Sequence, residues 1–337
     1  VIPWVHRSTR GWSYGSSVRD PRTGEIIKGH VSLGSLRIRQ DFMIAQALKA
    51  PYKPGQVSDD FALEMALARI RQLSAHEVGH TLGFSHNFAA STLNRSSVMD
   101  YPHPWIKASG GELDFSQAYA VGIGEWDKVT VKYAYGEFPG DEETELRNLL
   151  DQAFEEGHRY VTDADARPAG SSNVYAHLWD NGNDIVEELA NVMDVREIGI
   201  SNFSAANIRV DEPFTVLEDV FVPLYFYHRY QTEAVSKLIA GQEYGYRVRG
   251  GKQGPSKVLS AKEQQRALDA LMTTIDAKRL AIPKDKQDLF LPRAFGYPRT
   301  RESFISQLGV DFDPFSAAST ASRMTFSFVL HPERASR

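Results

Sequence analysis

Residues 76–86 read His-Glu-Val-Gly-His-Thr-Leu-Gly-Phe-Ser-His, a stretch that decides both the architecture and the chemistry expected of this chain. On a helix, His76 and His80 lie one turn apart on the same face, so their two imidazoles can bind one cation. Glu77 adjoins the first histidine and can reach a water molecule on that cation without being a ligand. The spacing predicts a helix that carries two metal ligands and a catalytic carboxylate.

A third histidine, His86, follows six residues after His80. A straight helix would carry it away from the metal, so the chain must turn between the two histidines. Gly83 stands where that turn is needed, because glycine adopts the left-handed conformation that ends a helix without a Cβ penalty. We therefore predict that the helix ends near Gly83 and that His86 is the third ligand.

Three neutral imidazoles favour a catalytic zinc site, since they leave a fourth coordination position open for water. Zinc lowers the pKa of its water and polarises a carbonyl oxygen, and Glu77 would take the proton of the attacking water. Hydrolysis of an amide bond follows from this arrangement. Iron or nickel could also occupy a three-histidine site. The chain contains no cysteine, which excludes disulfides and thiolate zinc sites.

Composition excludes other classes of protein. The 337 residues are 42% hydrophobic and 24% charged, as in ordinary globular proteins. The net charge is −5 and no block of Lys and Arg occurs, so nothing suggests a nucleic-acid partner. No apolar run approaches the length of a membrane span. Because the chain starts at Val1 without a signal peptide, we expect a piece of a longer protein whose targeting signal lies upstream.

The segment before the metal motif is predicted to be a β-hairpin followed by two helices. Strands are expected at residues 12–18 and Val31–Arg39, on either side of the turn at Asp20–Gly24, with a bulge near Gly34. A short helix is expected at residues 42–49. One long helix should run from about Asp59 to Leu82 and carry the motif near its C-terminal end.

The rest of the chain is predicted to be mainly helical. Helices are expected at residues 123–135, 141–157, 184–196, 213–240, 261–275 and 314–329, and an acidic loop at residues 162–184. Asp141, the Ser260–Glu263 capping box and Asp313–Pro314 mark helix starts. Pro223 should kink or break the helix around it. The fold class is thus α+β and helix-rich, with residues 1–140 as the catalytic domain and residues 141–337 as a helical region.

The eleven-residue motif resembles the signature of the metzincin metalloproteases, which also carry a methionine in a tight turn downstream. Met99 follows His86 by thirteen residues within Ser96–Pro102 and fits that position. The resemblance implies that Met99 forms a hydrophobic floor beneath the metal. Astacin-like and serralysin-like metzincins have a tyrosine two residues after the methionine. At that offset, the resemblance assigns Tyr101 the stabilisation of the oxyanion.

Residues 4–14, 20–26, 166–170 and 178–182 are similar to the large bacterial zinc-dependent metalloproteases of metzincin type. Those proteins carry extra domains ahead of the catalytic one and are usually exported, which implies a periplasmic, cell-envelope or secreted location. Asn87 departs from the Glu of astacins and the Pro of serralysins, and the calcium repeats of serralysins are absent. Substrate preference is therefore not transferred from either group.

A metzincin catalytic domain has a small twisted mixed sheet and a long active-site helix. Only residues 1–58 precede that helix here, so we expect part of the sheet to be missing or supplied from before Val1. In metzincins the strand before the helix forms the sheet edge and pairs with extended substrate. That implies substrate contacts from the run Val31–Arg39, namely Val31, Leu33, Gly34 and Ser35. An ordinary sheet strand is the alternative.

Two further groups of residues are candidate sites. His103 follows the methionine closely and could contact substrate, or it could be an ordinary loop histidine. Asp163, Asp165, Asp180 and Asp184 could bind Ca²⁺, but the glycine expected at the sixth position of an EF-type loop is Ile185. Solvated turn carboxylates are the alternative reading of these four residues.

The sequence thus predicts a zinc-dependent endopeptidase that acts on peptides or proteins. Two other functions stay open. One is a catalytically silent, zinc-stabilised module that binds peptide or glycan, although a pure binder has no use for Glu77. The other is a zinc hydrolase of a non-peptide amide.

Overall fold

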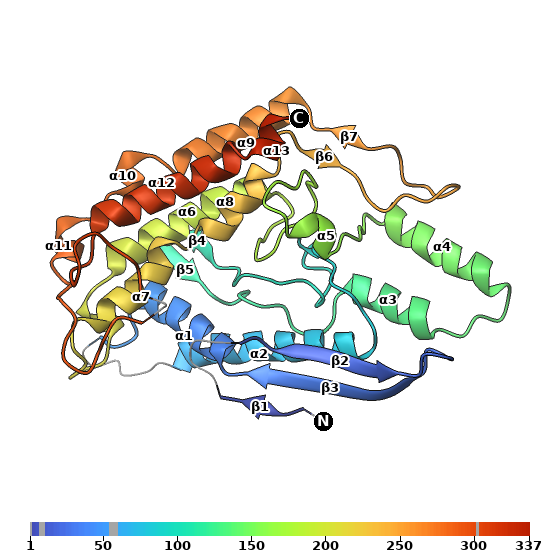
Figure 1. The fold of residues 1–337 in the computed structure, drawn as a ribbon, viewed down its shortest axis with the longest axis horizontal. Coiled ribbons are helices and arrows are strands. Elements are labelled where there is room, and N and C mark those ends of the chain that lie inside the picture. The colour runs from blue at the N-terminus through green and yellow to red at the C-terminus, as the bar shows by residue number, and fades with distance from the viewer. Residues whose placement is uncertain (1, 7–10, 54–59, 301–302) are drawn as a thin grey trace.

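The chain forms an α+β fold that is rich in helices and has small sheets, as the sequence predicts (Figure 1). This computed structural model describes residues 2–6, 11–53, 60–300 and 303–337. Over those residues, no helix is both long enough and apolar enough to cross a membrane.

The N-terminal sheet has three strands in the described part of the chain. They are β1 (Trp4–Val5), β2 (Tyr14–Arg19) and β3 (Ile26–Gly34), in the order β1-β3-β2. β3 pairs antiparallel with β2 and parallel with β1. The turn between β2 and β3 closes with a hydrogen bond from the N–H of Gly24 to the Asp20 carbonyl. Completion of the sheet by an upstream segment stays a prediction.

The predicted strand Val31–Arg39 is wrong in its second half. β3 ends at Gly34, and helix α1 runs from Leu36 to Lys49. Ile38, Phe42 and Ala45 stand at helical spacing, and the last two pack into the core. The change of phase near Gly34 is a switch from strand to helix and not a bulge. The register shift lies in β2, between Val18 and Arg19.

The predicted edge strand is also wrong, because β3 lies between β1 and β2, which leaves β2 at an edge of the described sheet. Val31 and Leu33 are buried against Leu73. Gly34 pairs with β1, and Ser35 occupies the N-cap of α1. These four residues therefore do not form the open edge that was predicted.

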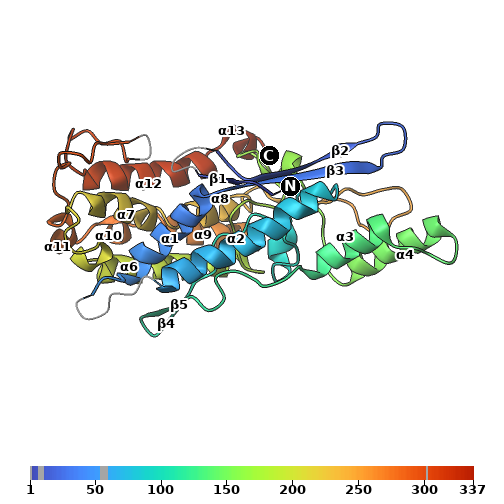
Figure 2. The ribbon, with the colours of Figure 1, turned by 90° about the horizontal axis from the view of Figure 1, so that it is seen from below.

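The predicted long helix is confirmed as α2 (Asp60–Thr81), which packs side by side with α1 and along the β2–β3 hairpin (Figure 2). Two glycines of the hairpin permit this close approach. A Cβ on Gly15 would lie 2.0 Å from the backbone oxygen of Glu77, and one on Gly29 would lie 3.0 Å from the Cβ of Thr81. The hairpin and the motif-bearing end of α2 are consequently in direct backbone contact.

The chain after the metal motif forms short elements and then two helices. The short elements are η1 (Ala90–Thr92), β4 (Lys107–Ser109) and β5 (Glu112–Asp114). Helices α3 (Glu125–Tyr135) and α4 (Glu142–Glu155) follow, and they lie at the end of the molecule toward which the hairpin projects (Figures 1 and 2). The predicted cap at Asp141 is confirmed, because its side chain accepts the N–H of Thr144.

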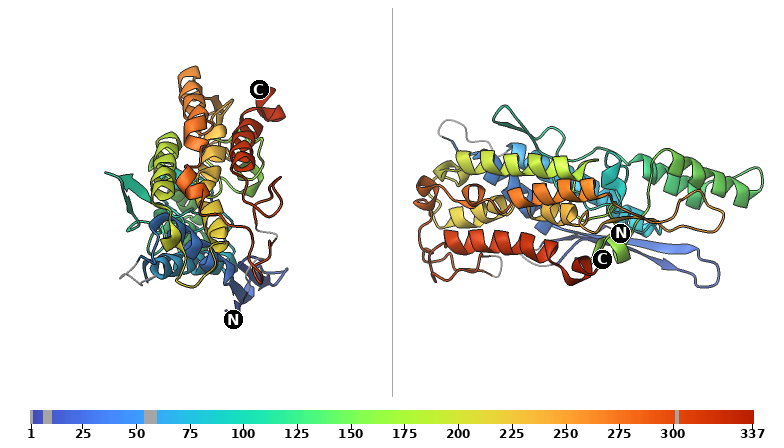
Figure 3. Two further views of the ribbon diagram at one scale, coloured as in Figure 1. Left: turned by 90° about the vertical axis from the view of Figure 1, so that its left-hand side faces the viewer. Right: turned by 90° about the horizontal axis from the view of Figure 1, so that it is seen from above.

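The remaining chain is mainly helical, as predicted. Helices α6 (Ile185–Asn202), α8 (Arg229–Ser236), α9 (Ala261–Thr273) and α12 (Pro314–Val329) pack together (Figure 3). The caps at Ser260 and Asp313 are confirmed, and the predicted helix at 213–240 is broken, since α7 ends two residues after Pro223. The elements are α5 (Asp163–Ala166), α6 (Ile185–Asn202), η2 (Ala205–Asn207), α7 (Val216–Tyr225), α8 (Arg229–Ser236), β6 (Gln242–Glu243), β7 (Lys257–Val258), α9 (Ala261–Thr273), α10 (Ala277–Leu280), α11 (Lys284–Gln287), α12 (Pro314–Val329) and α13 (Pro332–Ala335).

The largest hydrophobic core joins the two regions on either side of residue 140. Leu48 of α1 and Met65 of α2 belong to the same buried cluster as Leu217, Phe221 and Leu224 of α7. The regions predicted as a catalytic domain and a helical extension therefore share one core.

Candidate metal centre

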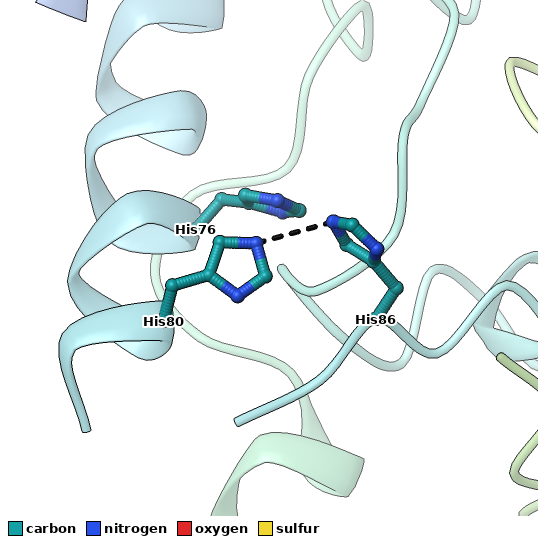
Figure 4. Close-up of side chains that lie close together, drawn as sticks. All are labelled: His76, His80 and His86. Atoms are coloured by element: carbon teal, nitrogen blue, oxygen red, sulfur yellow. Dashed lines mark hydrogen bonds between the residues drawn. The ribbon is translucent and has the colours of Figure 1, made fainter. Parts of the chain in front are cut away.

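The three histidines of the motif converge on one point (Figure 4). His76 and His80 project from α2, and His86 approaches from the chain beyond Gly83. Their potential ligand nitrogens lie within 4.8 Å of one another, and within the described residues they are the one such cluster of three or more His, Asp or Glu side chains. The Nε2 atoms of His80 and His86 are 3.1 Å apart.

In each of the three rings, Nδ1 is bound to an oxygen acceptor. The acceptors are the Val98 carbonyl for His76 (2.7 Å), the Phe84 carbonyl for His80 (2.8 Å) and the Asp163 carboxylate for His86 (2.8 Å). An Nδ1 that donates to oxygen leaves the lone pair of Nε2 free, which is how metal-bound histidines are usually oriented. Lone pairs as close as those of His80 and His86 repel one another unless a cation lies between them. The donor set therefore fits a zinc ion.

The predicted turn at Gly83 is confirmed. Gly83 has φ +94°. Its N–H donates to the His80 carbonyl (3.0 Å), and the N–H of Phe84 donates to the Gly79 carbonyl (3.1 Å). This pair of bonds is the Schellman motif that commonly ends a helix. The turn also places the Phe84 carbonyl beside Nδ1 of His80, so one glycine both ends α2 and orients the second histidine.

Burial favours the neutral, metal-binding form of His76 and His86. It lowers the pKa of His76 well below its usual value, and it also lowers the pKa of His86. Burial alone would raise the pKa of Asp163, but hydrogen bonds from His86 and Arg167 outweigh it and hold that pKa at about 2. Asp163 is therefore a charged acceptor for His86.

Glu77 is buried at the contact between α2 and the hairpin. One of its carboxylate oxygens, Oε2, has no hydrogen-bond partner among the described residues. Burial raises the pKa of Glu77 to about 7, against a smaller opposing effect of the hydrogen bond from the backbone of Gly15. A carboxyl group with a pKa near neutrality can both accept and release a proton.

Met99 and Tyr101 lie against the histidines. A Cβ on Gly79 would be 2.3 Å from Sδ of Met99, so the thioether packs directly on α2 between His76 and His80. The Tyr101 ring lies 5.3 Å from the His76 ring and 4.8 Å from the His86 ring. The phenol also hydrogen-bonds Arg167. The three histidines, Met99 and Tyr101 are thus gathered around one site.

Comparison with known protein families gives a match that covers most of the chain. A family model described as Met-zincin matches residues 58–337. The chain belongs to the Met-zincin family. Comparisons with curated proteins and with solved structures found no match. Family membership makes zinc metallopeptidase the general class of activity, and the three histidines support zinc as the metal.

One predicted contact of this Met-zincin is not brought to the site. His103 is buried, and its ring packs 4.8 Å from Tyr227 and 5.7 Å from Tyr230. Burial lowers its pKa well below the usual value. The histidine is therefore part of the packed interior and not a surface that meets substrate.

The four aspartates considered for calcium separate into different environments. Asp163 binds His86, and Asp165 accepts hydrogen bonds from Tyr244 and Tyr246. Asp180 accepts the hydroxyl of Ser91, whereas Asp184 caps α6 and pairs with Arg266. The described residues do not join these four carboxylates in a single group.

Sequence reasoning missed Asp127 as part of the site. Its carboxylate accepts the Ser97 hydroxyl (2.6 Å) and the N–H groups of Val98 (2.8 Å) and Gly124 (2.7 Å). It thereby holds the methionine turn and, through Val98, the carbonyl that orients His76. A carboxylate three residues after the N-cap of a predicted helix is a recognisable capping signal, so this residue could have been found.

A cleft of about 390 Å³ lies beside the metal centre of this Met-zincin. Its lining includes Gly15, Ser16 and Ser17 of β2 together with His80 and His86. The edge strand that borders the site is therefore β2 and not the predicted Val31–Arg39.

Proposed function

We propose that this chain is a zinc-dependent endopeptidase that hydrolyses peptide bonds in peptides or proteins. The proposal depends on one observation above all. The three motif histidines are each fixed through Nδ1 so that their Nε2 atoms face a common point, and Glu77 adjoins the first of them. Family membership supports the general class.

When bound by His76, His80 and His86, zinc would act as a Lewis acid that polarises the scissile carbonyl and makes water a better nucleophile. Glu77 would take the proton of the attacking water and pass it to the leaving amine. The Gly15 N–H orients the carboxyl group for this transfer.

Tyr101 would donate a hydrogen bond to the oxyanion that forms at the scissile carbonyl. Its position next to the His76 and His86 rings supports this role. Burial raises the pKa of Tyr101, which keeps the phenol protonated and able to donate. The Arg167 guanidinium, which hydrogen-bonds Tyr101 and pairs with Asp163, would hold the phenol near the metal.

Extended substrate would pair with the edge of β2 that no other strand of the described sheet occupies. Its residues Gly15 to Ser17 border the cleft that His80 and His86 also line. Addition of a peptide strand to a sheet edge supplies main-chain hydrogen bonds with little demand on sequence. We thus assign to β2 the pairing with substrate that was first expected of Val31–Arg39.

The test is replacement of Glu77 by Gln in zinc-loaded protein, with cleavage of a mixed peptide library read by mass spectrometry. We expect the zinc content to stay at one ion per chain and peptide cleavage to fall at least 100-fold. Glu64→Gln, on the exposed face of the same helix, is the matched control and should keep full activity. Full cleavage by Glu77→Gln would refute the mechanism.

The same library separates the other two functions. A zinc-loaded wild-type chain that retains peptides without cutting them would favour the silent binding module. A chain that neither binds nor cuts peptides, but hydrolyses small acyl amides in a Glu77-dependent way, would favour the non-peptide amidase.

A further inference from the structure

A second cavity, of about 330 Å³, lies next to the methionine turn. Asp100, which directly follows Met99, and Asp180, which comes from the loop before α6, both line it. Only 5% of Asp100 and 4% of Asp180 is exposed to solvent. Val121, at the same cavity, is 92% exposed, so the cavity connects two buried carboxylates with the surface.

Ser91 links the two carboxylates. Its N–H hydrogen-bonds Asp100, and its hydroxyl donates to Oδ2 of Asp180 (3.0 Å). Asp100 also accepts the N–H of Tyr101 (2.6 Å). Oδ1 of Asp180, in contrast, has no hydrogen-bond partner among the described residues. One carboxylate oxygen is thus buried at the cavity without a donor.

The positively charged side chains near Asp100 and Asp180 form their hydrogen bonds with other groups. Arg69 and Lys237 are close enough to act on the carboxylates electrostatically. Arg69 nevertheless hydrogen-bonds Gln72, and Lys237 donates to backbone carbonyls. Within the described ranges, neither carboxylate forms an ion pair. Two buried carboxyl groups without a paired cation are costly to ionise, because burial removes the hydration that stabilises charge.

Neutral donors at the same cavity add an independent indication of a ligand. Only 3% of Asn181 is exposed, and its Oδ1 has no hydrogen-bond partner among the described residues. Its Nδ2 donates to the His103 carbonyl (3.0 Å), which fixes Oδ1 as the free end of the amide. Nδ1 of His158, also buried at this cavity, is likewise without a partner there. Carboxylate and amide oxygens together are the donors that Ca²⁺ prefers.

We propose that this cavity binds a divalent cation of the calcium class, held by oxygens of Asp100, Asp180 and Asn181, with water completing the coordination. The all-oxygen donor set distinguishes it from the three-histidine centre, which suits zinc. Two carboxylates with neutral donors correspond to weak sites, with a dissociation constant on the order of 0.1–1 mM. Bound cation would tie the methionine turn to the loop that carries Trp179, whose ring stacks on Tyr101.

The proposal is tested on the full zinc-loaded chain, with Tb³⁺ as a luminescent probe excited through tryptophan and Ca²⁺ as competitor. Trp179, adjacent to Asp180, is the expected sensitiser. We expect saturable Tb³⁺ luminescence that Ca²⁺ displaces. We also expect 10 mM Ca²⁺ to raise the melting temperature by roughly 2 °C or more, because a ligand that binds only the folded state stabilises it.

Asp180→Asn should weaken Ca²⁺ binding at least tenfold and remove the thermal shift. Asp165→Asn is the matched control, since that aspartate lies in the same acidic stretch but binds Tyr244 and Tyr246. If Asp180→Asn does not fold, Asn181→Ala replaces it, with a several-fold loss expected.

Wild-type protein without Tb³⁺ luminescence or a Ca²⁺-dependent shift would overturn the proposal. Equal Ca²⁺ affinity in wild type and Asp180→Asn would also overturn it.

Discussion

Gly79 stands between His76 and His80, and its missing Cβ is what lets Met99 reach the surface of α2. A methyl group there would overlap the thioether, at 2.3 Å from Sδ. Met99 is flexible enough to move away, but it is buried and has little space to move into. Position 79 is one of the two unspecified positions of HExxH. In this chain, the packing of Met99 on it restricts which residue can stand there.

We predict that Gly79→Ala lowers the free energy of unfolding by roughly 1–3 kcal/mol, as overpacking of a core contact does. Urea denaturation measures the change. Gly254→Ala is the control, because a Cβ there would meet nothing within 4 Å. Met99→Ala should cost less in the Gly79→Ala background than in wild type, and strict additivity of the two changes would contradict the contact.

Asp163 acts on the metal centre through His86. We predict that Asp163→Ala weakens zinc binding roughly 10–100-fold, because loss of the acceptor at Nδ1 frees the ring to rotate. Competition with a chromophoric chelator measures the affinity. Asp165→Ala, two positions along the same helix α5, is the control for loss of a carboxylate. Unchanged zinc affinity in Asp163→Ala would show that the hydrogen bond does not orient the ligand.

At the scale of elements, α3 supports the metal site through its first turn. Asp127 holds the Ser97 hydroxyl and the Val98 N–H, and the Val98 carbonyl holds His76. The start of one helix therefore orients a ligand on another.

We predict that Asp127→Ala lowers the free energy of unfolding by roughly 2–3 kcal/mol, since it leaves buried donors unpaired, and that it also weakens zinc binding. Asp141→Ala removes a comparable cap from α4 and should cost about 1 kcal/mol with no effect on zinc. Thermal unfolding with and without zinc measures both. Equal zinc affinity in the two variants would contradict the link.

Elements with local signals were predictable from the sequence. Capping residues and helical spacing located α2, α9 and α12 to within about two residues. The helix predicted at residues 42–49 is confirmed as the second part of α1, but the prediction for residues 36–39 failed. Leu36 and Ile38 continue an alternating pattern, whereas Ile38, Phe42 and Ala45 also satisfy a helical one. Periodicity could not decide between them. The order of strands failed for a different reason, because it depends on contacts that are distant in sequence.

At the scale of the whole molecule, the parts of the site with local sequence signals were predicted, and a part that depends on contacts distant in sequence was missed. His76, His80 and Glu77 lie on one helix, so their spacing was sufficient. Asp163 follows His86 by 77 positions, and the two come together where Phe88 packs in one buried cluster with Val161 and Ala166. No local pattern marks such a residue.

The interior histidines predict how stability depends on pH. Burial lowers the pKa of His103 and His177 well below the usual value and that of His228 to about 3. Between pH 7 and 5 the unfolded chain therefore binds more protons at these positions than the folded chain. Stability falls as the pH falls, by up to about 1.4 kcal/mol per pH unit for each histidine. Buried Asp180, whose pKa is raised to about 7, acts in the opposite sense.

We predict that His228→Phe reduces the loss of stability between pH 7 and pH 5 by roughly 2 kcal/mol relative to wild type. Urea denaturation at the two pH values measures the difference, and comparison of the two proteins cancels the contribution of the zinc ligands. An identical pH dependence in both would mean that His228 is protonated in the folded state.

The bond between His86 and Asp163 has a consequence for synthesis on the ribosome. A nascent chain that has emerged as far as residue 140 already presents all three histidines and Glu77, but not the carboxylate that aims the third ring. On the function proposed above, competence to cut peptides would then be delayed until the later helices have been translated and docked. Such a delay would protect the cell that makes the enzyme from an active fragment.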